Sequence, residues 1–151
     1  MLAICAQRVG VQRRAPTEAK DKNGQTPLHQ AAWFGASKSL RALLQCGAEI
    51  HARDECGMTP LHVAARKCSI NCIRELLKAG EDPNVRDSSG GTPLHALAKS
   101  LEDSHRGGQP GCAFYLLEHG ANPDLVDKAG NEPFSPLCIC RSRQLMAERL
   151  S

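Results

Sequence analysis

The chain has 151 residues, 41% of them hydrophobic, and a formal net charge of +3, which is the composition of an ordinary globular protein. No apolar stretch is long enough to cross a bilayer, and the basic residues are dispersed rather than clustered as in nucleic-acid-binding proteins. Aromatic residues make up only 3% of the chain, so we expect a core of aliphatic, alanine and cysteine side chains. We therefore expect one domain, no membrane span and no nucleic acid as a partner.

The first 20 residues allow two interpretations. They contain three arginines and no acidic residue before Glu18, which superficially fits an organelle transit sequence. However, APTEAKD at 15–21 overlays AEIHARD at 48–54, which lies 33 residues later. We favour a degenerate half-repeat over residues 1–20, which forms an N-terminal cap or frays.

A motif with a fixed period follows. The tetrapeptide Thr-Pro-Leu-His begins at Thr26, Thr59 and Thr92, 33 residues apart, and a degenerate Glu-Pro-Phe-Ser begins 40 residues later at Glu132. An aspartate and a glycine keep the same steps: Asp21, Asp54, Asp87 and Asp127; Gly24, Gly57, Gly90 and Gly130. The frame predicts repeats over 21–53, 54–86 and 87–126, and a truncated C-terminal capping repeat over 127–151.

Each repeat predicts two helices. Threonine can cap the first helix, proline fits its first position, and leucine points inward. Alanine pairs at 31–32 and 64–65 keep this helix narrow, so that a neighbouring pair can approach closely. The second helix has apolar positions three and four apart: Leu40, Leu43, Leu44; Ile73, Leu76, Leu77; Ala113, Leu116, Leu117. A glycine follows each second helix, where helices commonly end in a left-handed residue: Gly47, Gly80 and Gly120.

The segment DKNGQTPLHQAAWFGASKSLRALLQCGAEIHARD at 21–54 resembles an ankyrin repeat from end to end. The resemblance covers roughly residues 21–150. It implies an all-α repeat solenoid, in which each unit consists of a β-hairpin or turn finger, an inner helix, a turn and an outer helix.

Two features of the turn between the helices stand out. The third repeat has seven extra residues, and SLEDSHRGGQPG at 100–111 predicts a flexible exposed loop, more typical of a tolerated insertion than of a functional site. In the second repeat, Cys68 stands where the first has Gly35, so we expect a non-glycine residue in a left-handed conformation.

The sequence contains no constellation typical of an enzyme or of a cofactor site. Of the six histidines, the resemblance assigns His29, His62 and His95 to bridges between backbone groups. The eight cysteines have no paired CxxC spacing, and we expect mostly small buried hydrophobic side chains in a reducing compartment. A metal- or redox-responsive protein using Cys46, Cys56, Cys68 and Cys72 is the alternative.

The resemblance implies that a partner contacts the finger tips and the exposed side of the inner helices. Carried over to this chain, the candidate binding residues are Lys22, Asn23, Gln25, Trp33, Phe34, Glu55, Cys56, Met58, Arg66, Lys67, Ser88, Ser89, Gly91, Lys99 and Ser100, with Lys128, Ala129 and Asn131 from the last repeat.

Trp33 and Phe34 follow an alanine pair, at inner-helix positions that we expect to be exposed. Tryptophan is frequent among binding hot spots, so we interpret the pair as anchors; the alternative is a cap over the N-terminal segment. Arg66, Lys67 and Lys99 continue the row and predict a partner with an acidic segment and an apolar anchor, unless they are simply solvated charges.

The resulting hypothesis is a non-catalytic, monomeric protein-interaction module of the cytoplasm, the nucleus or both. One alternative is the substrate-recognition part of a ubiquitin ligase, but SPLCICRSRQLM at 135–146 is only faintly similar to an elongin-binding box, with Arg141 where the box has cysteine. Asn84 is similar to the finger asparagines that are hydroxylated in ankyrin proteins. Because the chain starts within a repeat and stops before a finger, we expect a short isoform or a fragment.

Overall fold

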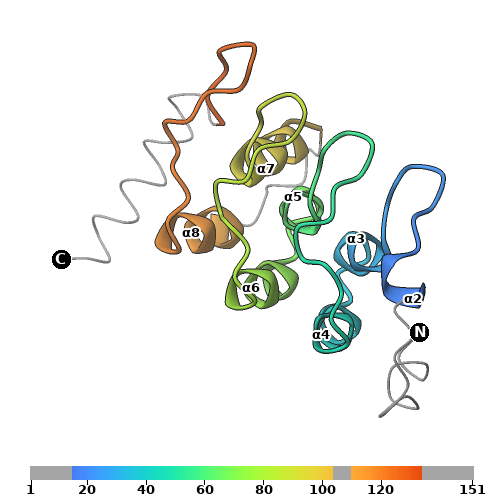
Figure 1. The fold of residues 1–151 in the computed structure, drawn as a ribbon. Coiled ribbons are helices and arrows are strands. Elements are labelled where there is room, and N and C mark those ends of the chain that lie inside the picture. Colours follow the sequence, from blue (N-terminus) through green and yellow to red (C-terminus); the bar gives the residue numbers. More distant parts are fainter. Residues whose placement is uncertain (1–14, 104–109, 134–151) are drawn as a thin grey trace.

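The computed structural model describes residues 15–103 and 110–133, drawn in colour in Figure 1. The helices are α2 (Ala15–Glu18), α3 (Pro27–Trp33), α4 (Ser37–Gln45), α5 (Pro60–Arg66), α6 (Ile70–Lys78), α7 (Pro93–Asp103) and α8 (Pro110–Glu118). Figure 1 shows them in two rows, with α3, α5 and α7 beside a series of loops that all extend to the same side. The expectation of an all-α repeat solenoid is confirmed.

The loops are the predicted fingers, which we define as residues 21–25, 54–58, 87–91 and 127–131. Each is closed by a hydrogen bond from the amide of its first residue to the carbonyl of its last, for example Asp21 N to Gln25 O at 2.9 Å. No strand occurs within the described ranges, so the fingers are hydrogen-bonded turns rather than pairs of β-strands.

The inner helices begin where the tetrapeptide predicts. Thr26 is the extended N-cap of α3, Pro27 is the first helical residue, and Nδ1 of His29 accepts a hydrogen bond from the Thr26 amide at 3.1 Å. Because Nδ1 accepts this bond, the ring proton resides on Nε2, which donates to the carbonyl of Met58 in the next finger at 2.8 Å. The predicted backbone bridge by the motif histidine is thus confirmed, and it joins consecutive repeats.

Consecutive helices stack in linear order. α3 contacts α4 and α5, α5 contacts α6 and α7, and the outer helices contact one another as α4 with α6 and α6 with α8. The shared core contains completely buried leucine and isoleucine side chains from both rows: Leu28, Leu61 and Leu94 on the inner helices, and Leu40, Ile73 and Leu116 on the outer ones. Each repeat therefore shelters the apolar side of its neighbour.

The turns between helices follow the glycine pattern. Gly47, Gly80 and Gly120 have φ values of +85°, +100° and +96°, as expected for residues that end helices in the left-handed region. In the turn that joins α5 to α6, Cys68 has φ +53°, close to the +67° of Gly35 in the previous repeat. The expected left-handed cysteine is confirmed.

The insertion differs from the prediction. Helix α7 continues to Asp103, and α8 already begins at Pro110, so a flexible loop over 100–111 is wrong at both ends. Lys-Ser-Leu-Glu-Asp contains several good helix formers, which allow the helix to continue, and proline is favoured at the first position of a helix. Residues 104–109 lie outside the described ranges.

The proposed end caps fall largely on residues that the structure does not describe. Helix α2 contacts α3 at the N-terminal end, but residues 1–14 and 134–151 lie outside the described ranges, so the assignments of 1–20 and 127–151 stay predictions. None of the described helices has the length and apolar character needed to cross a membrane.

Candidate functional site

The conformation of each finger is fixed by its aspartate. In the first finger, Oδ1 of Asp21 accepts hydrogen bonds from the amides of Asn23 and Gln25, at 2.8 and 3.0 Å. The same pair of bonds recurs in the other three fingers. These backbone donors stabilise the ionised carboxylate and lower the pKa of Asp21 and of Asp127. The tip residues between them are therefore held in one geometry.

Neighbouring fingers are also joined to one another. One backbone hydrogen bond links each pair: Glu55 N to Asn23 O, Ser88 N to Cys56 O, and Lys128 N to Ser89 O, at 2.9–3.1 Å. Together with the closed turns, this row of bonds presents the tip side chains on a common frame.

A row of basic side chains links the residues that directly precede the fingers. Lys20 donates to Arg53 O at 3.2 Å, Arg53 to Arg86 O at 2.6 Å, and Arg86 to Val126 O at 3.0 Å. The sequence reasoning missed these residues. The signal was available, because a basic residue directly precedes the finger aspartate in the first three repeats.

The aromatic pair lies at the C-terminal end of α3. Phe34 is 75% exposed and Trp33 is 38% exposed. The ammonium group of Lys67 lies 3.6 Å from the centroid of the Trp33 ring, in a cation–π contact between the first two repeats. Lys67 thus covers part of the Trp33 ring, where the sequence suggested only a basic extension of the groove.

The other predicted binding residues lie along what we call the inner face, which consists of the fingers and the exposed ends of α3, α5 and α7. Lys22, Asn23, Glu55, Cys56, Arg66, Lys67, Ser88, Ser89, Lys99, Lys128, Ala129 and Asn131 are exposed, and Gln25, Met58 and Ser100 are half-buried. Gly91 is buried, contrary to expectation, because its amide donates to Asp87 within the finger and its carbonyl faces His62. Whether these residues bind a partner stays a prediction.

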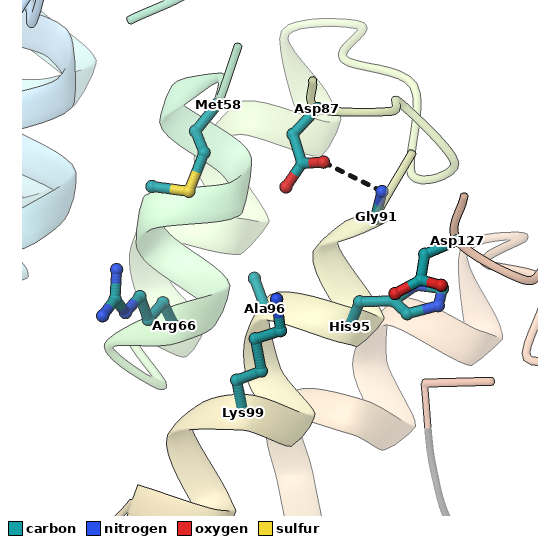
Figure 2. Close-up of a pocket in the computed structure, with 8 residues that line it drawn as sticks. All are labelled: Met58, Arg66, Asp87, Gly91, His95, Ala96, Lys99 and Asp127. Carbon is teal, nitrogen blue, oxygen red and sulfur yellow. Dashed lines mark hydrogen bonds between the residues drawn. The ribbon is translucent and has the colours of Figure 1, made fainter. Parts of the chain in front are cut away.

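A pocket of about 310 Å³ lies on the inner face between α5 and α7. Figure 2 shows Arg66 and Lys99 at the helix side of this pocket and Asp87 and Asp127 at the finger side. The remaining lining residues are Met58, Gly91, His95 and Ala96. The pocket therefore has two cationic groups and two carboxylates on different walls.

Residues 43–127, more than half of the chain, match the family model for ankyrin repeats in three copies, and residues 23–55 match the model for a single ankyrin repeat. The chain belongs to the ankyrin repeat family. Ankyrin repeats are generally protein–protein interaction modules and are typically non-catalytic. A comparison with curated proteins finds no match.

The ankyrin array buries two motif histidines in the neutral form. Burial is the main cause that lowers the pKa of His29 and of His62, against the opposing effect of their hydrogen bonds to Met58 O and Gly91 O. Both rings serve as links between repeats, and Nδ1 of each also lies within hydrogen-bond distance of the hydroxyl of the N-cap threonine, Thr26 or Thr59.

A buried carboxylate interrupts the ankyrin pattern at Glu81. The residue after the turn glycine is a buried alanine in the first and third repeats, Ala48 and Ala121, but here it is Glu81, which is 4% exposed. Oε1 lies 3.0 Å from Nδ1 of His51, whereas Oε2 has no hydrogen-bond partner among the described residues. Burial raises the pKa of Glu81, and His51 partly offsets this. The sequence reasoning did not single out this departure from the repeat.

The five described cysteines differ in burial, and Cys68 is half-buried. Cys72 and Cys112 are buried, and burial raises the pKa of each thiol to about 11. Cys46 and Cys56 are exposed, so the expectation of small buried side chains is wrong for these two, because they follow an outer helix and lie at a finger tip. Within the described ranges, no three His, Cys, Asp or Glu side chains are grouped so that they could hold a metal ion.

Two modification and assembly hypotheses stay predictions. The Asn84 side chain donates to Gly120 O at 2.9 Å and accepts from the Asn122 amide at 2.7 Å, so it bridges two repeats, and a hydroxylase would have to break both bonds to reach it. Peptide mass spectrometry without any oxidised Asn84 would count against that modification. The faint elongin-box likeness at 135–146 lies outside the described residues.

Proposed function

We propose that this ankyrin repeat protein is a non-catalytic interaction module that binds a partner protein on its inner face, as a scaffold, an adaptor or a regulatory binder. The observation that supports this proposal most is the exposed aromatic pair. Among the described residues, the exposed large hydrophobic side chains are Trp33, Phe34 and Val126. Two of the three are adjacent, in a chain with few aromatic residues, and such residues are frequent hot spots in interfaces.

The charges around the pair suggest the chemistry of the partner. Trp33, Arg66 and Lys99 occupy the same position in successive repeats, and Arg66 and Lys99 line the pocket without a salt bridge or hydrogen bond to other described residues. A partner segment with an apolar anchor and acidic residues complements this arrangement. We place the function in the cytoplasm or the nucleus, where thiols such as the exposed Cys56 stay reduced; cell fractionation that finds the protein in a secretory compartment would contradict this location.

The test is affinity capture from cell extract with the wild type, followed by titration of the captured protein against variants. We expect Trp33→Ala and Phe34→Ala each to weaken binding by about 30-fold, which corresponds to a hot-spot loss of about 2 kcal/mol. Lys78→Ala is the control, because Lys78 is exposed on the outer helix α6.

Circular dichroism of each variant separates binding from folding. Since more than a third of the Trp33 side chain is exposed, its truncation should leave the array folded. Unchanged binding by both aromatic variants would refute the proposal, and unfolding of the Trp33→Ala variant would identify the tryptophan as a structural cap instead.

A further inference from the structure

Two wall positions of the pocket between α5 and α7 carry smaller side chains than in the preceding repeat. Gly91 occupies the position of Met58, and Ala96 the position of Val63, one 33-residue repeat earlier. Both small residues line the pocket. The space that they leave, about 310 Å³, is at the lower end of the range for sites that accept a small ligand or a few side chains.

Ala96 also leaves a hydrogen-bond acceptor open. In the first repeat, the equivalent residue Gln30 donates to Oδ2 of Asp21 at 3.0 Å, so both oxygens of that carboxylate are bonded. In the third repeat, Oδ1 of Asp87 accepts from the finger amides, but alanine at position 96 has no donor for Oδ2. Figure 2 shows the Asp87 carboxylate with one oxygen bonded to the Gly91 amide.

The opposite wall carries the two cations. Arg66 ends α5 and Lys99 lies on α7, one repeat apart, and neither is paired with another described residue. Both charges would attract an acidic side chain that enters this pocket. A doubly charged phosphate group fits less well, because the carboxylates of Asp87 and Asp127 line the same pocket and would repel it.

We propose that this pocket binds two consecutive side chains of an extended partner segment: an acidic residue that reaches Arg66 and Lys99, and a neighbour with a hydrogen-bond donor that reaches Oδ2 of Asp87. Successive side chains of an extended chain point in opposite directions, which matches cations on one wall and an open acceptor on the other. The inference rests on the proposed function and specifies the partner sequence at this pocket.

The aromatic pair sets the spacing of the partner motif. Trp33 lies one repeat before Arg66, and neighbouring helices pack about 8–10 Å apart, so the pocket between α5 and α7 is roughly 12–15 Å from Trp33. An extended chain covers that distance in about four residues at about 3.3 Å each. The partner motif is therefore an apolar residue and, about four positions further along the chain, an acidic residue next to a donor.

Selection from a random peptide library displayed on phage tests this motif with a defined probe. We expect the wild type to enrich peptides with the apolar residue and the acid–donor pair at this spacing. Synthetic peptides from the selection are then titrated by fluorescence anisotropy. Ala96→Gln is the blocking variant: it places at position 96 the residue that the first repeat carries there, which fills the pocket, donates to Asp87 and suits a helix.

We expect Ala96→Gln and Lys99→Glu each to weaken peptide binding by about 10-fold or more, because each removes an interaction with a pocket wall. The control for charge is Lys78→Glu, the same reversal on the outer helix α6, which should bind like the wild type. Repeating the selection with Lys99→Glu should enrich a basic residue in place of the acidic one.

The outcomes separate this inference from the proposed function. Peptides whose binding depends on Trp33 but not on Ala96→Gln or Lys99→Glu would overturn the pocket motif and leave the interaction module intact. Equal losses in Lys99→Glu and Lys78→Glu would also overturn it, because the attraction would then be a property of net charge. A wild type that enriches no peptide, together with a Trp33→Ala variant that captures the same cellular proteins, would contradict both.

Discussion

Gly57, at the end of the second finger, offers a sharp test of how closely the fingers pack. Its φ is +70°, and a Cβ atom there would lie 2.7 Å from the amide nitrogen of Ser88 and closer still to its hydroxyl. The hydroxyl can rotate away, but the amide belongs to the next finger and donates to Cys56 O at 3.1 Å. To restore an ordinary 3.4 Å contact, the fingers would have to separate by 0.7 Å, which would stretch this hydrogen bond beyond useful length.

The expected loss for Gly57→Ala follows from three effects. Alanine at positive φ costs about 1–2 kcal/mol, of which about 0.5–1 kcal/mol is offset by the reduced freedom of the unfolded chain. The lost hydrogen bond adds about 0.5–1.5 kcal/mol. Gly47→Ala is the control, because Gly47 has φ +85° and a Cβ there meets no described atom within 4 Å. Gly47→Ala should therefore lose only the backbone strain less its entropic offset, with no hydrogen bond broken. Gly57→Ala should be less stable than Gly47→Ala by about 1 kcal/mol.

Urea denaturation followed by circular dichroism measures both free energies of unfolding. If the two variants lose the same stability, contact between the fingers contributes nothing and only backbone strain matters. A larger loss for Gly47→Ala would refute the reasoning altogether.

Three further predictions concern charge. Burial lowers the pKa of His29 and His62, so as the pH falls these histidines bind protons in the unfolded chain before they do in the folded one. Their contribution to stability should be fully present above about pH 6.5 and be lost as the pH falls through the folded pKa values. Urea midpoints that do not change between neutral and mildly acidic pH would contradict this. Burial raises the pKa of Glu81, so the ionised carboxylate destabilises the fold as the pH rises above about 4.5. Glu81→Ala should therefore be more stable than the wild type by about 1 kcal/mol at neutral pH and by less under acid conditions, which thermal melts at both pH values would measure. Arg53→Ala removes donors to two carbonyls, Gly57 O in the second finger and Arg86 O directly before the third, and should lose about 1 kcal/mol, whereas Lys78→Ala should melt like the wild type.

The repeated motif predicted local structure well. Thr26, His29 and their counterparts mark helix starts because capping depends on neighbouring residues, and the left-handed φ of Cys68 follows from the glycine at the same position one repeat earlier. The side-chain contact of Lys67 with Trp33 was not predicted. Lys67 over Trp33 depends on how far apart two repeats lie, and that distance is not encoded in the spacing of a motif.

Departures from the repeat were also predicted poorly. Glu81 stands in an alanine position, and burial there follows from the fold rather than from residue type. In the insertion, glycine, serine and proline suggested a loop, but helix α7 persists to Asp103, because a helix that is already formed extends into acceptable residues at little cost. The pocket required comparison of Ala96 with Gln30 and Val63 across three repeats, which the sequence permits once the fold has identified the shared wall.

Two sets of side-chain hydrogen bonds between repeats run in the same direction along the polypeptide. His29, His62 and His95 each donate forward to a carbonyl of the following finger, and Lys20, Arg53 and Arg86 each donate forward to the carbonyl of the residue directly before that finger. A shortened chain that stops before Asp127 would leave the buried imidazole N–H of His95 without its acceptor, Asn131 O. A chain that keeps the fourth finger would retain this acceptor. Functional truncations should therefore be made after a finger, with the boundary set by the acceptor rather than by the last helix.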